Sequence, residues 1–324
     1  MTASSKISVA PMMDYTDRHC RYFLRLLSKH TLLYTEMITT GAILHGNRDK
    51  LLGYDQAEHP LALQLGGSNP TDLAECAKIA EEWGYNEVNI NVGCPSDRVQ
   101  SGMFGLCLMA KPDLVADCVK AMKDQVGIPV TVKTRIGFDN NDSYQELLHF
   151  IQTLVNSGVD QVIIHARKGW LKGLSPKENR DIPPLDYERV YQIKRDFPTL
   201  NIGINGGIQT LAQAETHLKS IDHVMIGRSA YHDPYILMSV DQAIHQSQTP
   251  IKTRQEIIEA FMPYAEARLA EGDSIKALTR HILGLFHGEP NARLWRRMLS
   301  DTTYITKNSG PEVINAALEA TIAG

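Results

Sequence analysis

The chain has 324 residues, of which 43% are hydrophobic and 22% are charged. These fractions are typical of a globular protein with a buried core, and they exclude a disordered, collagen-like or disulfide-scaffold protein. The 33 Lys and Arg residues against 37 Asp and Glu residues give a net charge of −4. Any nucleic-acid partner must therefore be held by a local basic patch rather than by bulk charge.

The sequence gives no sign of a membrane or secreted protein. It contains no run of about 18 apolar residues that would predict a membrane span. The segment MTASSKIS lacks the basic and apolar regions of a secretory signal peptide. The five cysteines are an odd number and include no Cys-x-x-Cys pair. We therefore expect a reducing, cytoplasmic location and no membrane partner.

Short apolar or β-branched runs recur along the first part of the chain, and we expect each to be a strand. They are Ile7–Met12, Leu32–Met37, Leu61–Leu65, Glu87–Val92, Pro129–Ile136, Gln161–Ala166, Asn201–Asn205 and His223–Gly227. Segments with helical spacing separate most of them, and alternating strands and helices pair the strands in parallel. Eight units in about 240 residues predict a (β/α)8 TIM barrel. No Gly-x-Gly-x-x-Gly follows the first strand, so an open dinucleotide-binding sheet is disfavoured.

The pattern changes after Asp241. The segment Gln246–Thr253 is polar, contains a proline and is typical of a linker. Helical segments without strand alternation follow it, at Arg254–Glu271, Ile275–Leu285, Ala292–Leu299 and Pro311–Thr321. We therefore expect a barrel domain at residues 1–245 and a small all-helical domain at residues 250–324.

In a TIM barrel, the carboxyl ends of the strands and the loops after them form the active site. Two glycine-containing turns stand there, Asn205-Gly206-Gly207-Ile208 after the seventh predicted strand and Gly227-Arg228 after the eighth. Their backbone N–H groups lie beside short helix starts, which favours a phosphate site. The alternative is that these glycines only form tight turns.

Three further polar side chains end predicted strands. Lys133 points into the barrel mouth, where a cation needs an anionic partner. It is a candidate for a Schiff base, for stabilising an anionic cofactor, or for a structural ion pair with Glu36 or a neighbouring residue. His165 is a candidate donor to a phosphate or to a cofactor carbonyl, or a structural hydrogen-bonding residue. The amide of Gln64 offers both a donor and an acceptor to the edge of a heterocycle.

Cys94 is the main candidate for chemistry. It follows the fourth predicted strand within Asn91-Val92-Gly93-Cys94-Pro95, a turn that removes it from regular packing. Cys76 and Cys118, by contrast, fit the buried faces of helices. Cys94 is therefore a candidate acid, base or nucleophile. No Cys/His cluster accompanies it, so we expect no metal site.

In combination, these residues resemble the tRNA-dihydrouridine synthase family. The resemblance rests on Ala10-Pro11-Met12, Gln64, Asn91-Val92-Gly93-Cys94-Pro95, Lys133, His165 with Arg167, and the two glycine turns. The run from Gly93 to Gly105 is similar to the A-type members in particular. The resemblance extends over essentially the whole chain, including the helical part.

The resemblance implies an enzyme that uses FMN to reduce the C5–C6 double bond of uridine in tRNA, with NADPH or NADH as the electron donor. The A type is associated with D-loop uridines at positions 20 and 20a. Hydride would pass from FMN to C6, and Cys94 would supply the proton to C5. The implied cofactor-binding residues are Pro11, Met12, Met13, Gln64, Lys133, His165, Asn205, Gly206, Gly207, Gly227 and Arg228.

The resemblance also implies where tRNA binds. Asn91 would hold the target base or its ribose. Two groups of basic residues lie in the loop after the sixth strand and on one face of a helix in the predicted helical domain. By match to the family, Lys177 and Arg180 of the first group and Arg293 and Arg296 of the second would contact tRNA. The alternative is a solvated charged face. We expect the helical domain to bind tRNA and the protein to act as a monomer.

Two other functions compete with this one. The first is a flavin barrel that acts on a free pyrimidine or another small molecule, as dihydroorotate dehydrogenases do. The second is an RNA-binding flavoprotein without catalysis. The basic helix and the linker favour a macromolecular substrate over the first alternative. The presence of Cys94, Lys133 and His165 together argues against the second.

Overall fold

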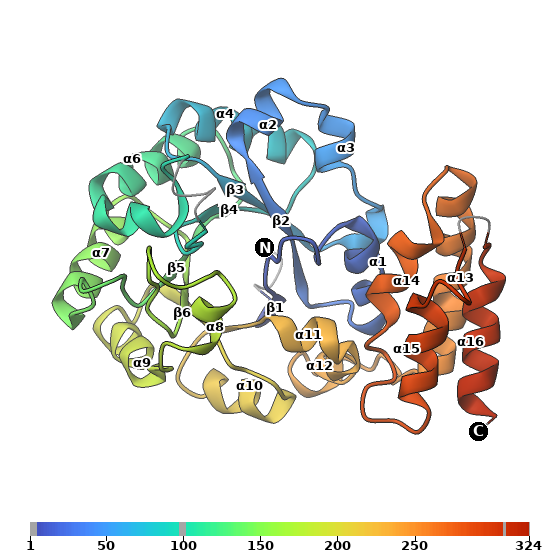
Figure 1. The fold of residues 1–324 in the computed structure, drawn as a ribbon. Helices are drawn as coiled ribbons and strands as arrows, with labels where there is room; N and C mark the ends of the chain where they lie inside the picture. The colour runs from blue at the N-terminus through green and yellow to red at the C-terminus, as the bar shows by residue number, and fades with distance from the viewer. Residues whose placement is uncertain (1–4, 97–101, 307–308, 324) are drawn as a thin grey trace.

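In the computed structural model, which describes residues 5–96, 102–306 and 309–323, parallel strands close into a barrel (Figure 1). The strands are β1 (Ile7–Val9), β2 (Leu32–Thr39), β3 (Leu61–Gly66), β4 (Glu87–Asn91), β5 (Val130–Arg135), β6 (Gln161–His165), β7 (Asn201–Asn205) and β8 (His223–Ile226). Each strand pairs with its neighbours in sequence, and β8 closes the barrel against β1. The predicted (β/α)8 barrel, followed by a helical part, is confirmed.

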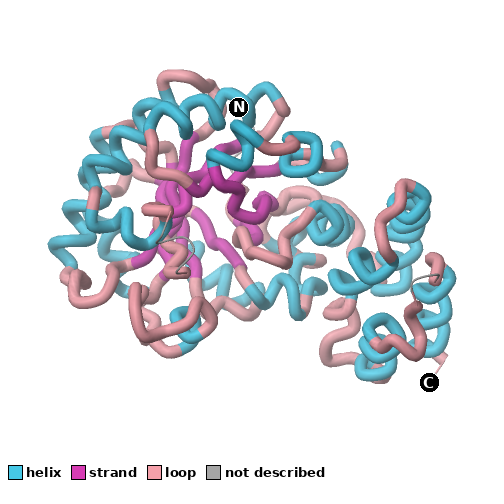
Figure 2. The backbone as a smooth tube through the Cα atoms, turned by 45° about the horizontal axis from the view of Figure 1, so that its top comes forward, coloured by secondary structure: helices cyan, strands magenta, loops and turns pink. Residues whose placement is uncertain are grey.

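Helices surround the strands and form the outer layer (Figure 2). They are α1 (Arg18–Leu27), α2 (Thr40–His45), α3 (Arg48–Leu52), α4 (Pro70–Glu82), α6 (Pro112–Lys123), α7 (Tyr144–Asn156), α8 (Glu178–Asp181), α9 (Tyr187–Asp196), α10 (Leu211–Leu218), α11 (Arg228–His232) and α12 (Val240–Ala243). Short 3-10 helices occur at η1 (Gln56–Glu58), η2 (Gly105–Ala110) and η3 (Pro234–Leu237). The helices bury the apolar faces that their spacing predicts, with Cys76 and Cys118 among the buried residues.

The first strand is shorter than its apolar run. The N–H of Ala10 still donates to the Ile226 carbonyl at 2.8 Å, but β1 ends at Val9. Pro11 has no N–H to continue the pairing. The segment that follows, Met12 and Met13 included, therefore leaves the sheet and enters the mouth of the barrel.

Alternate residues of each strand point into the barrel. One part of the interior is an apolar cluster of Ala10, Leu32, Tyr34, Ala62, Ile163 and Met225. Toward the carboxyl ends of β3, β4 and β5 the inward positions are polar instead, and the register sets Gln64 beside Asn89 and Asn91 beside Lys133. The outward residues of the same strands pack against the helices in the main core. The barrel interior is thus divided into an apolar part and a polar part.

The chain after the barrel forms a helical tail of α13 (Arg254–Ala270), α14 (Ile275–Ile282), α15 (Ala292–Ser300) and α16 (Glu312–Ile322). The tail packs against α1, where the rings of Tyr22 and Tyr264 stack with centroids 3.8 Å apart. Phe23 and Phe261 make an edge-to-face contact beside them. Among the described residues, no helix is both long and apolar enough to cross a membrane.

A half-buried carboxylate, Asp17, joins the tail to the barrel. Asp17 accepts hydrogen bonds from the backbone N–H groups of His19 and Cys20 at the start of α1. The same side chain pairs with His281 Nε2 at 2.9 Å and with Arg280 of α14. Burial alone would raise the pKa of Asp17, but the hydrogen bond and charge of His281, with the other donors, hold it well below its usual value.

We expect Asp17→Asn to lower the free energy of unfolding by about 2 kcal/mol at neutral pH, because hydrogen bonds to a charged acceptor are lost. Since the folded-state pKa of Asp17 is depressed, its contribution is present above the ordinary value of 3.8 and is lost as the pH falls below it. Urea denaturation at several pH values measures the difference. Asp186→Asn is the matched control, since Asp186 caps α9 and an asparagine caps equally well. A deficit that persisted unchanged in strong acid would contradict this account.

Candidate active site

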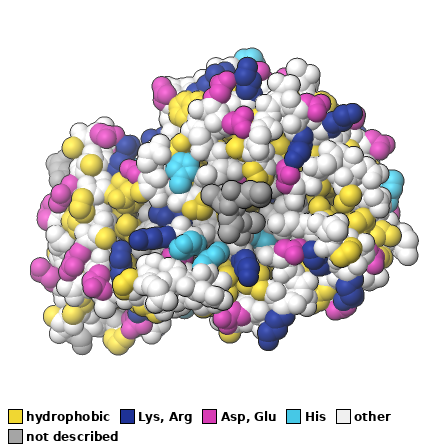
Figure 3. Space-filling view, turned by 180° about the vertical axis from the view of Figure 1, so that it is seen from behind, with side chains coloured by type: hydrophobic (Ala, Val, Ile, Leu, Met, Phe, Trp, Pro, Cys, Tyr) yellow, Lys and Arg dark blue, Asp and Glu magenta, His cyan; other side chains and the backbone are white. Residues whose placement is uncertain are grey.

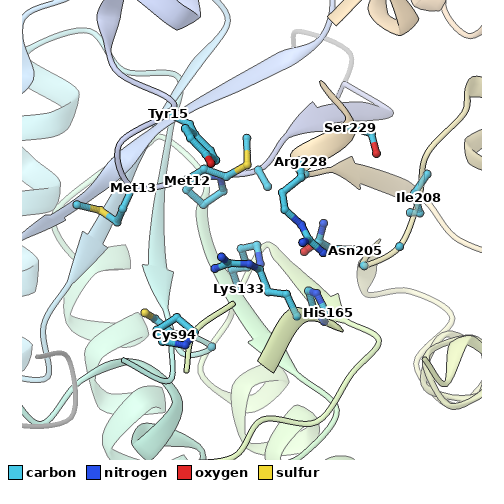
Figure 4. A pocket seen from close by; sticks show the side chains of 18 of the residues that line it. Met12, Met13, Tyr15, Cys94, Lys133, His165, Asn205, Ile208, Arg228 and Ser229 are labelled. Atoms are coloured by element: carbon cyan, nitrogen blue, oxygen red, sulfur yellow. The ribbon is translucent and has the colours of Figure 1, made fainter. Parts of the chain in front are cut away.

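A cavity of about 1030 Å³ opens at the carboxyl ends of the strands. Residues at the ends of all eight strands line it, and His287 from the tail completes its rim. Figure 4 shows Cys94 on one side and the β7 and β8 turns, with Asn205, Ile208 and Arg228, on the other. The side chain of Lys133 lies between them. The position of the cavity is that of the active site in TIM-barrel enzymes.

The structure brings most of the sequence-predicted site residues together. Those that line the cavity are Pro11, Met12, Met13, Gln64, Asn91, Cys94, Lys133, His165, Arg180, Asn205, Gly206, Gly207, Gly227 and Arg228. Lys177 is exposed at the start of α8 and does not line the cavity. Arg293 and Arg296 line a second hollow beside it. Part of the Gly93–Gly105 motif, residues 97–101, lies outside the described residues.

The turn that carries Cys94 is held from both sides. The Oδ1 atom of Asn91 accepts the backbone N–H groups of Gly93 and Cys94, at 3.1 and 2.9 Å. Arg135 Nε donates to the Gly93 carbonyl at 2.9 Å. The Cys94 side chain is half-buried, and its Sγ lies 3.6 Å from Ser96 Oγ. These contacts fix the backbone of the turn while the thiol remains accessible from the cavity.

Asn91 was predicted to hold the target base or its ribose. Its Nδ2 donates to Gln64 Oε1 at 2.9 Å, and its Oδ1 accepts from the backbone N–H of Cys94. An amide nitrogen carries two hydrogens. Within the described structure only one of them has a partner, so the other is available to a ligand in the cavity.

Lys133 brings an amino group from the end of β5 into the cavity. No carboxylate of the described residues pairs with it, and Glu36 accepts the N–H of Asp14 instead. The alternative of a structural Lys133–Glu36 ion pair is therefore wrong. Burial, with the charge of Arg135 adding to it, lowers the pKa of Lys133 to about 7. A desolvated ammonium in this state is stabilised by an anionic ligand.

His165 presents a hydrogen-bond donor to the cavity. Burial, together with the charges of Arg135 and Lys133, holds the pKa of His165 well below its usual value, so the ring is neutral. Its Nδ1 lies 3.2 Å from the N–H of Arg167 and accepts it. A neutral imidazole with Nδ1 as acceptor carries its hydrogen on Nε2. Nε2 is therefore the donor that a ligand would meet.

The β7 turn carries glycines where neighbouring side chains leave no room for a Cβ, and the β8 turn carries one where the space is open. Gly206 and Gly207 have φ angles of +113° and +70°, in the region that favours glycine. A Cβ on Gly207 would lie 2.6 Å from Leu185 Cδ1, whereas one on Gly227 would meet no atom within 4 Å. The open space over Gly227 lies beside Arg228, whose guanidinium pairs with Asp181 at 2.6 Å. The arrangement suits a phosphate group.

The donors around the cavity fit an anionic, phosphate-bearing cofactor such as FMN. Lys133, which lines the cavity, has no carboxylate partner among the described residues. The open space over Gly227 leaves room for a phosphate, and His165 offers a neutral donor. No group of three or more His, Cys, Asp or Glu side chains among the described residues is arranged to hold a metal ion.

Sequence reasoning missed three residues of this site. Arg135 donates to the Gly93, Lys168 and Asn179 carbonyls, and these contacts depend on loops that the pattern does not predict. Tyr15 lines the cavity and stacks on Tyr231 of α11, with centroids 4.2 Å apart. His287 reaches the rim only because the tail docks on the barrel. None of the three carries a local sequence signal.

A second hollow of about 670 Å³ adjoins the cavity and shares His287 with it. Arg293, Arg296 and Arg297 of α15 line it, as helical spacing predicted. Figure 3 shows Lys and Arg side chains on the face where the tail meets the barrel. A basic surface therefore continues from the cavity along the tail, although the whole chain is slightly acidic.

Comparison with known proteins agrees with this geometry. A family model described as dihydrouridine synthase (Dus) matches residues 8–321. The tRNA-dihydrouridine(20/20a) synthase of Shewanella oneidensis is 61% identical over 313 residues, which cover 97% of this chain and 93% of that protein. The enzyme of the same name from Vibrio parahaemolyticus is 60% identical, with 98% and 97% covered. That of Escherichia coli K12 is 61% identical, with 93% and 87% covered.

Proposed function

Because the chain belongs to the dihydrouridine synthase family, we propose that its cavity is the site at which a uridine of tRNA is reduced to dihydrouridine, with FMN as cofactor and NADPH as electron donor. Reduction of uridine in tRNA is the activity of the family, and the resemblance found in the sequence is confirmed. The observation that supports the site is the convergence on a single cavity of an accessible thiol, Cys94, and a cation, Lys133, that has no carboxylate partner among the described residues. The names of the relatives favour uridines 20 and 20a as targets.

FMN, when bound, supplies the hydride that reduces C6 of the uracil ring. The turns at Gly206-Gly207 and Gly227-Arg228, with Asn205 beside them, would hold its phosphate. His165 Nε2 would donate to the cofactor, and Lys133 would lie against its anionic ring. The ring edges would contact Pro11, Met12, Met13 and the amide of Gln64. The same mouth would admit the nicotinamide before the RNA enters.

The chain itself must deliver a proton and hold the base. After hydride reaches C6, negative charge spreads over C5 and the C4 carbonyl, and a proton is needed at C5. Cys94 Sγ–H would give that proton, and the thiolate would regain one from solvent. A thiol is a suitable acid near neutral pH. The base must leave its stack to enter the cavity, which costs a few kcal/mol unless a loop nucleotide is used. The free N–H of Asn91 would then contact it.

The tRNA body would lie over the basic surface described above. Arg180 at the rim, Lys177 beside it, and Arg293 and Arg296 on the tail would contact phosphates or bases. The helical domain at residues 250–324 would thus bind tRNA, while residues 1–245 would carry out catalysis as part of a monomer in the cytoplasm. This division explains why a chain with a net charge of −4 can bind RNA.

The experiment that tests the function uses the purified protein, FMN, NADPH and tRNA transcribed without modifications. We expect two mass units to be added at each modified uridine, and nuclease mapping to place them at positions 20 and 20a. Free uridine and free pyrimidines serve as the comparison substrates. Faster reduction of a free pyrimidine than of tRNA would favour the small-molecule alternative, and RNA binding without any mass gain would favour the non-catalytic one.

We expect Arg293→Ala combined with Arg296→Ala to weaken tRNA binding and to flatten its salt dependence. Each lost phosphate contact lowers the slope of log affinity against log salt by roughly 0.7 to 0.9. Filter binding at several salt concentrations measures both effects. The control is Arg195→Ala combined with Lys219→Ala, which removes two charges near the carboxyl ends of α9 and α10, on the barrel face opposite the cavity. Equal salt slopes for the two double variants would contradict the assignment.

A further inference from the structure

A chain of hydrogen bonds runs down the inside of the barrel below the cavity. It begins at Asn91, whose Nδ2 donates to Gln64 Oε1 at 2.9 Å. Gln64 Nε2 donates to Asn89 Oδ1 at 2.8 Å. The three amides come from β3 and β4, and each is at most 9% exposed. A row of buried amides is stable only if every donor and acceptor in it is matched.

The chain continues to a carboxylate on the barrel floor. Asn89 Nδ2 donates to Thr131 Oγ1 at 2.8 Å, and Thr131 Oγ1 donates to Glu87 Oε1 at 2.6 Å. Tyr34 donates its hydroxyl to the same oxygen of Glu87. None of Thr131, Glu87 and Tyr34 lines the cavity, and the proposed reaction uses none of them. All three are buried beside the apolar part of the interior.

Every donor in this chain points the same way, from the cavity toward the floor. The orientation of a side-chain amide is assigned from its partners, so the two ends of the chain decide it. At the upper end, the N–H groups of Gly93 and Cys94 can only donate, which requires the Asn91 carbonyl to face them. At the lower end, Glu87 Oε1 accepts from Thr131. Both ends therefore require each side chain to donate toward the floor. An amide between them that turned its oxygen and nitrogen around would lose a hydrogen-bond partner.

We propose that Thr131 and Glu87 are positioning residues, which hold the turn of Cys94 in place through this chain. Because Glu87 Oε1 accepts the hydrogen of the Thr131 hydroxyl, the Thr131 oxygen is left to accept from Asn89. This contact sets the orientation of the Asn89 amide, and through it the orientations of the amides above. The last amide, that of Asn91, then presents its oxygen to the cysteine turn. The same chain fixes which end of the Gln64 amide faces each neighbour. This inference rests on the proposed role of Cys94 as the proton donor.

The polarity of the chain does not depend on the charge of Glu87. Burial raises the pKa of Glu87 to about 7, although hydrogen bonds from Thr131 and Tyr34 lower it. Both hydroxyls donate to Oε1, so a proton can reside on Oε2 without reversing any bond. A glutamine at this position keeps a carbonyl acceptor and should therefore preserve the chain. A methionine has similar volume but no such acceptor.

The test measures how fast iodoacetamide alkylates Cys94 in the flavin-free protein, by mass spectrometry of the cysteine peptides. Thr131→Val breaks the chain, Thr131→Ser restores the hydroxyl, and Thr134→Val is the matched control. Thr134 is buried on the same strand but points outward, with its nearest acceptors at 3.5 Å. The buried cysteines at positions 20, 76 and 118 must stay unreactive, which shows that the variants are folded.

We expect Thr131→Val to speed alkylation of Cys94 about fivefold, because the loss of one hydrogen bond loosens the turn that carries the thiol. Thr131→Ser and Thr134→Val should match the wild type. Should Thr131→Val fail to fold, Glu87→Met and Glu87→Gln give the same comparison, with the glutamine variant matching the wild type. Alkylation at the wild-type rate in the folded chain-breaking variant would overturn the proposal. The assay contains neither flavin nor tRNA, so its outcome does not depend on whether the proposed reduction of uridine takes place.

Discussion

Replacing Cys94 by alanine should slow the reduction of uridine in tRNA by a factor of about 10² to 10⁴. The variant lacks the group that delivers a proton to C5, and the remaining turn offers no thiol in its place. Reduction of the flavin by NADPH should proceed at the wild-type rate, because the thiol has no part in it. Single-turnover mixing of pre-reduced enzyme with unmodified tRNA separates the two half-reactions.

Cys107→Ala is the matched control for this experiment. Cys107 is also half-buried, but its Sγ contacts the Phe104 carbonyl at 3.2 Å and does not line the cavity. This variant should reduce tRNA at the wild-type rate. If Cys94→Ala and Cys107→Ala behaved alike in the single turnover, Cys94 would not be the proton donor.

Lys133→Met should have the second largest effect. The ammonium of Lys133 has no carboxylate partner among the described residues, and its loss removes a charge from the region where the flavin ring would lie. Charge-assisted contacts of this kind are worth about 1.5 to 3 kcal/mol, so FMN affinity should fall roughly 10- to 100-fold. Fluorescence titration with FMN measures the change. Lys168→Met is the control, since Lys168 pairs with Asp142 outside the cavity.

The same substitution should change how stability depends on pH. The pKa of Lys133 falls from 10.5 to about 7 on folding without flavin, so between these values the unfolded chain binds more protons than the folded one. The stability of the wild type should therefore rise, relative to Lys133→Met, as the pH increases from 7 to 10. Each unit of pKa difference is worth about 1.4 kcal/mol. Urea denaturation of the flavin-free proteins measures this, and a fall in relative stability would contradict the depressed pKa.

The barrel was predictable because the chemistry of its strands is local. Eight apolar runs separated by helical spacing admit few other arrangements, and the rule that barrel sites form at strand ends then selects Cys94, Lys133 and His165. The shortening of β1 follows from Pro11, which cannot donate to the sheet. The helical tail was predictable from its loss of alternation. Its docking through Tyr22 and Tyr264 was not, because that contact joins distant segments.

The parts of the site that the sequence did not predict all depend on three-dimensional register. Alternation indicates that Gln64 and Thr131 point inward, but only the pairing of β3, β4 and β5 shows which amide meets which hydroxyl. Arg135 holds the cysteine turn through a backbone carbonyl, which no side-chain motif records. His287 belongs to the rim only once the tail is in place. Long-range contacts of this kind leave no periodic trace in one sequence.

Because Cys94 and the β7 and β8 turns lie on opposite sides of the cavity (Figure 4), the cofactor and Cys94 should act on opposite faces of one extruded uracil. The most direct measurement is the stereochemistry of addition to tRNA in deuterium oxide with NADPH deuterated at both C4 positions, so that the hydrogens added at C5 and at C6 are both deuterium. Digestion to nucleosides and the vicinal proton coupling then show whether the two deuterons lie on opposite faces or on the same face. The account predicts addition to opposite faces. Addition to the same face would contradict it, because the proton would then come from the cofactor side of the cavity.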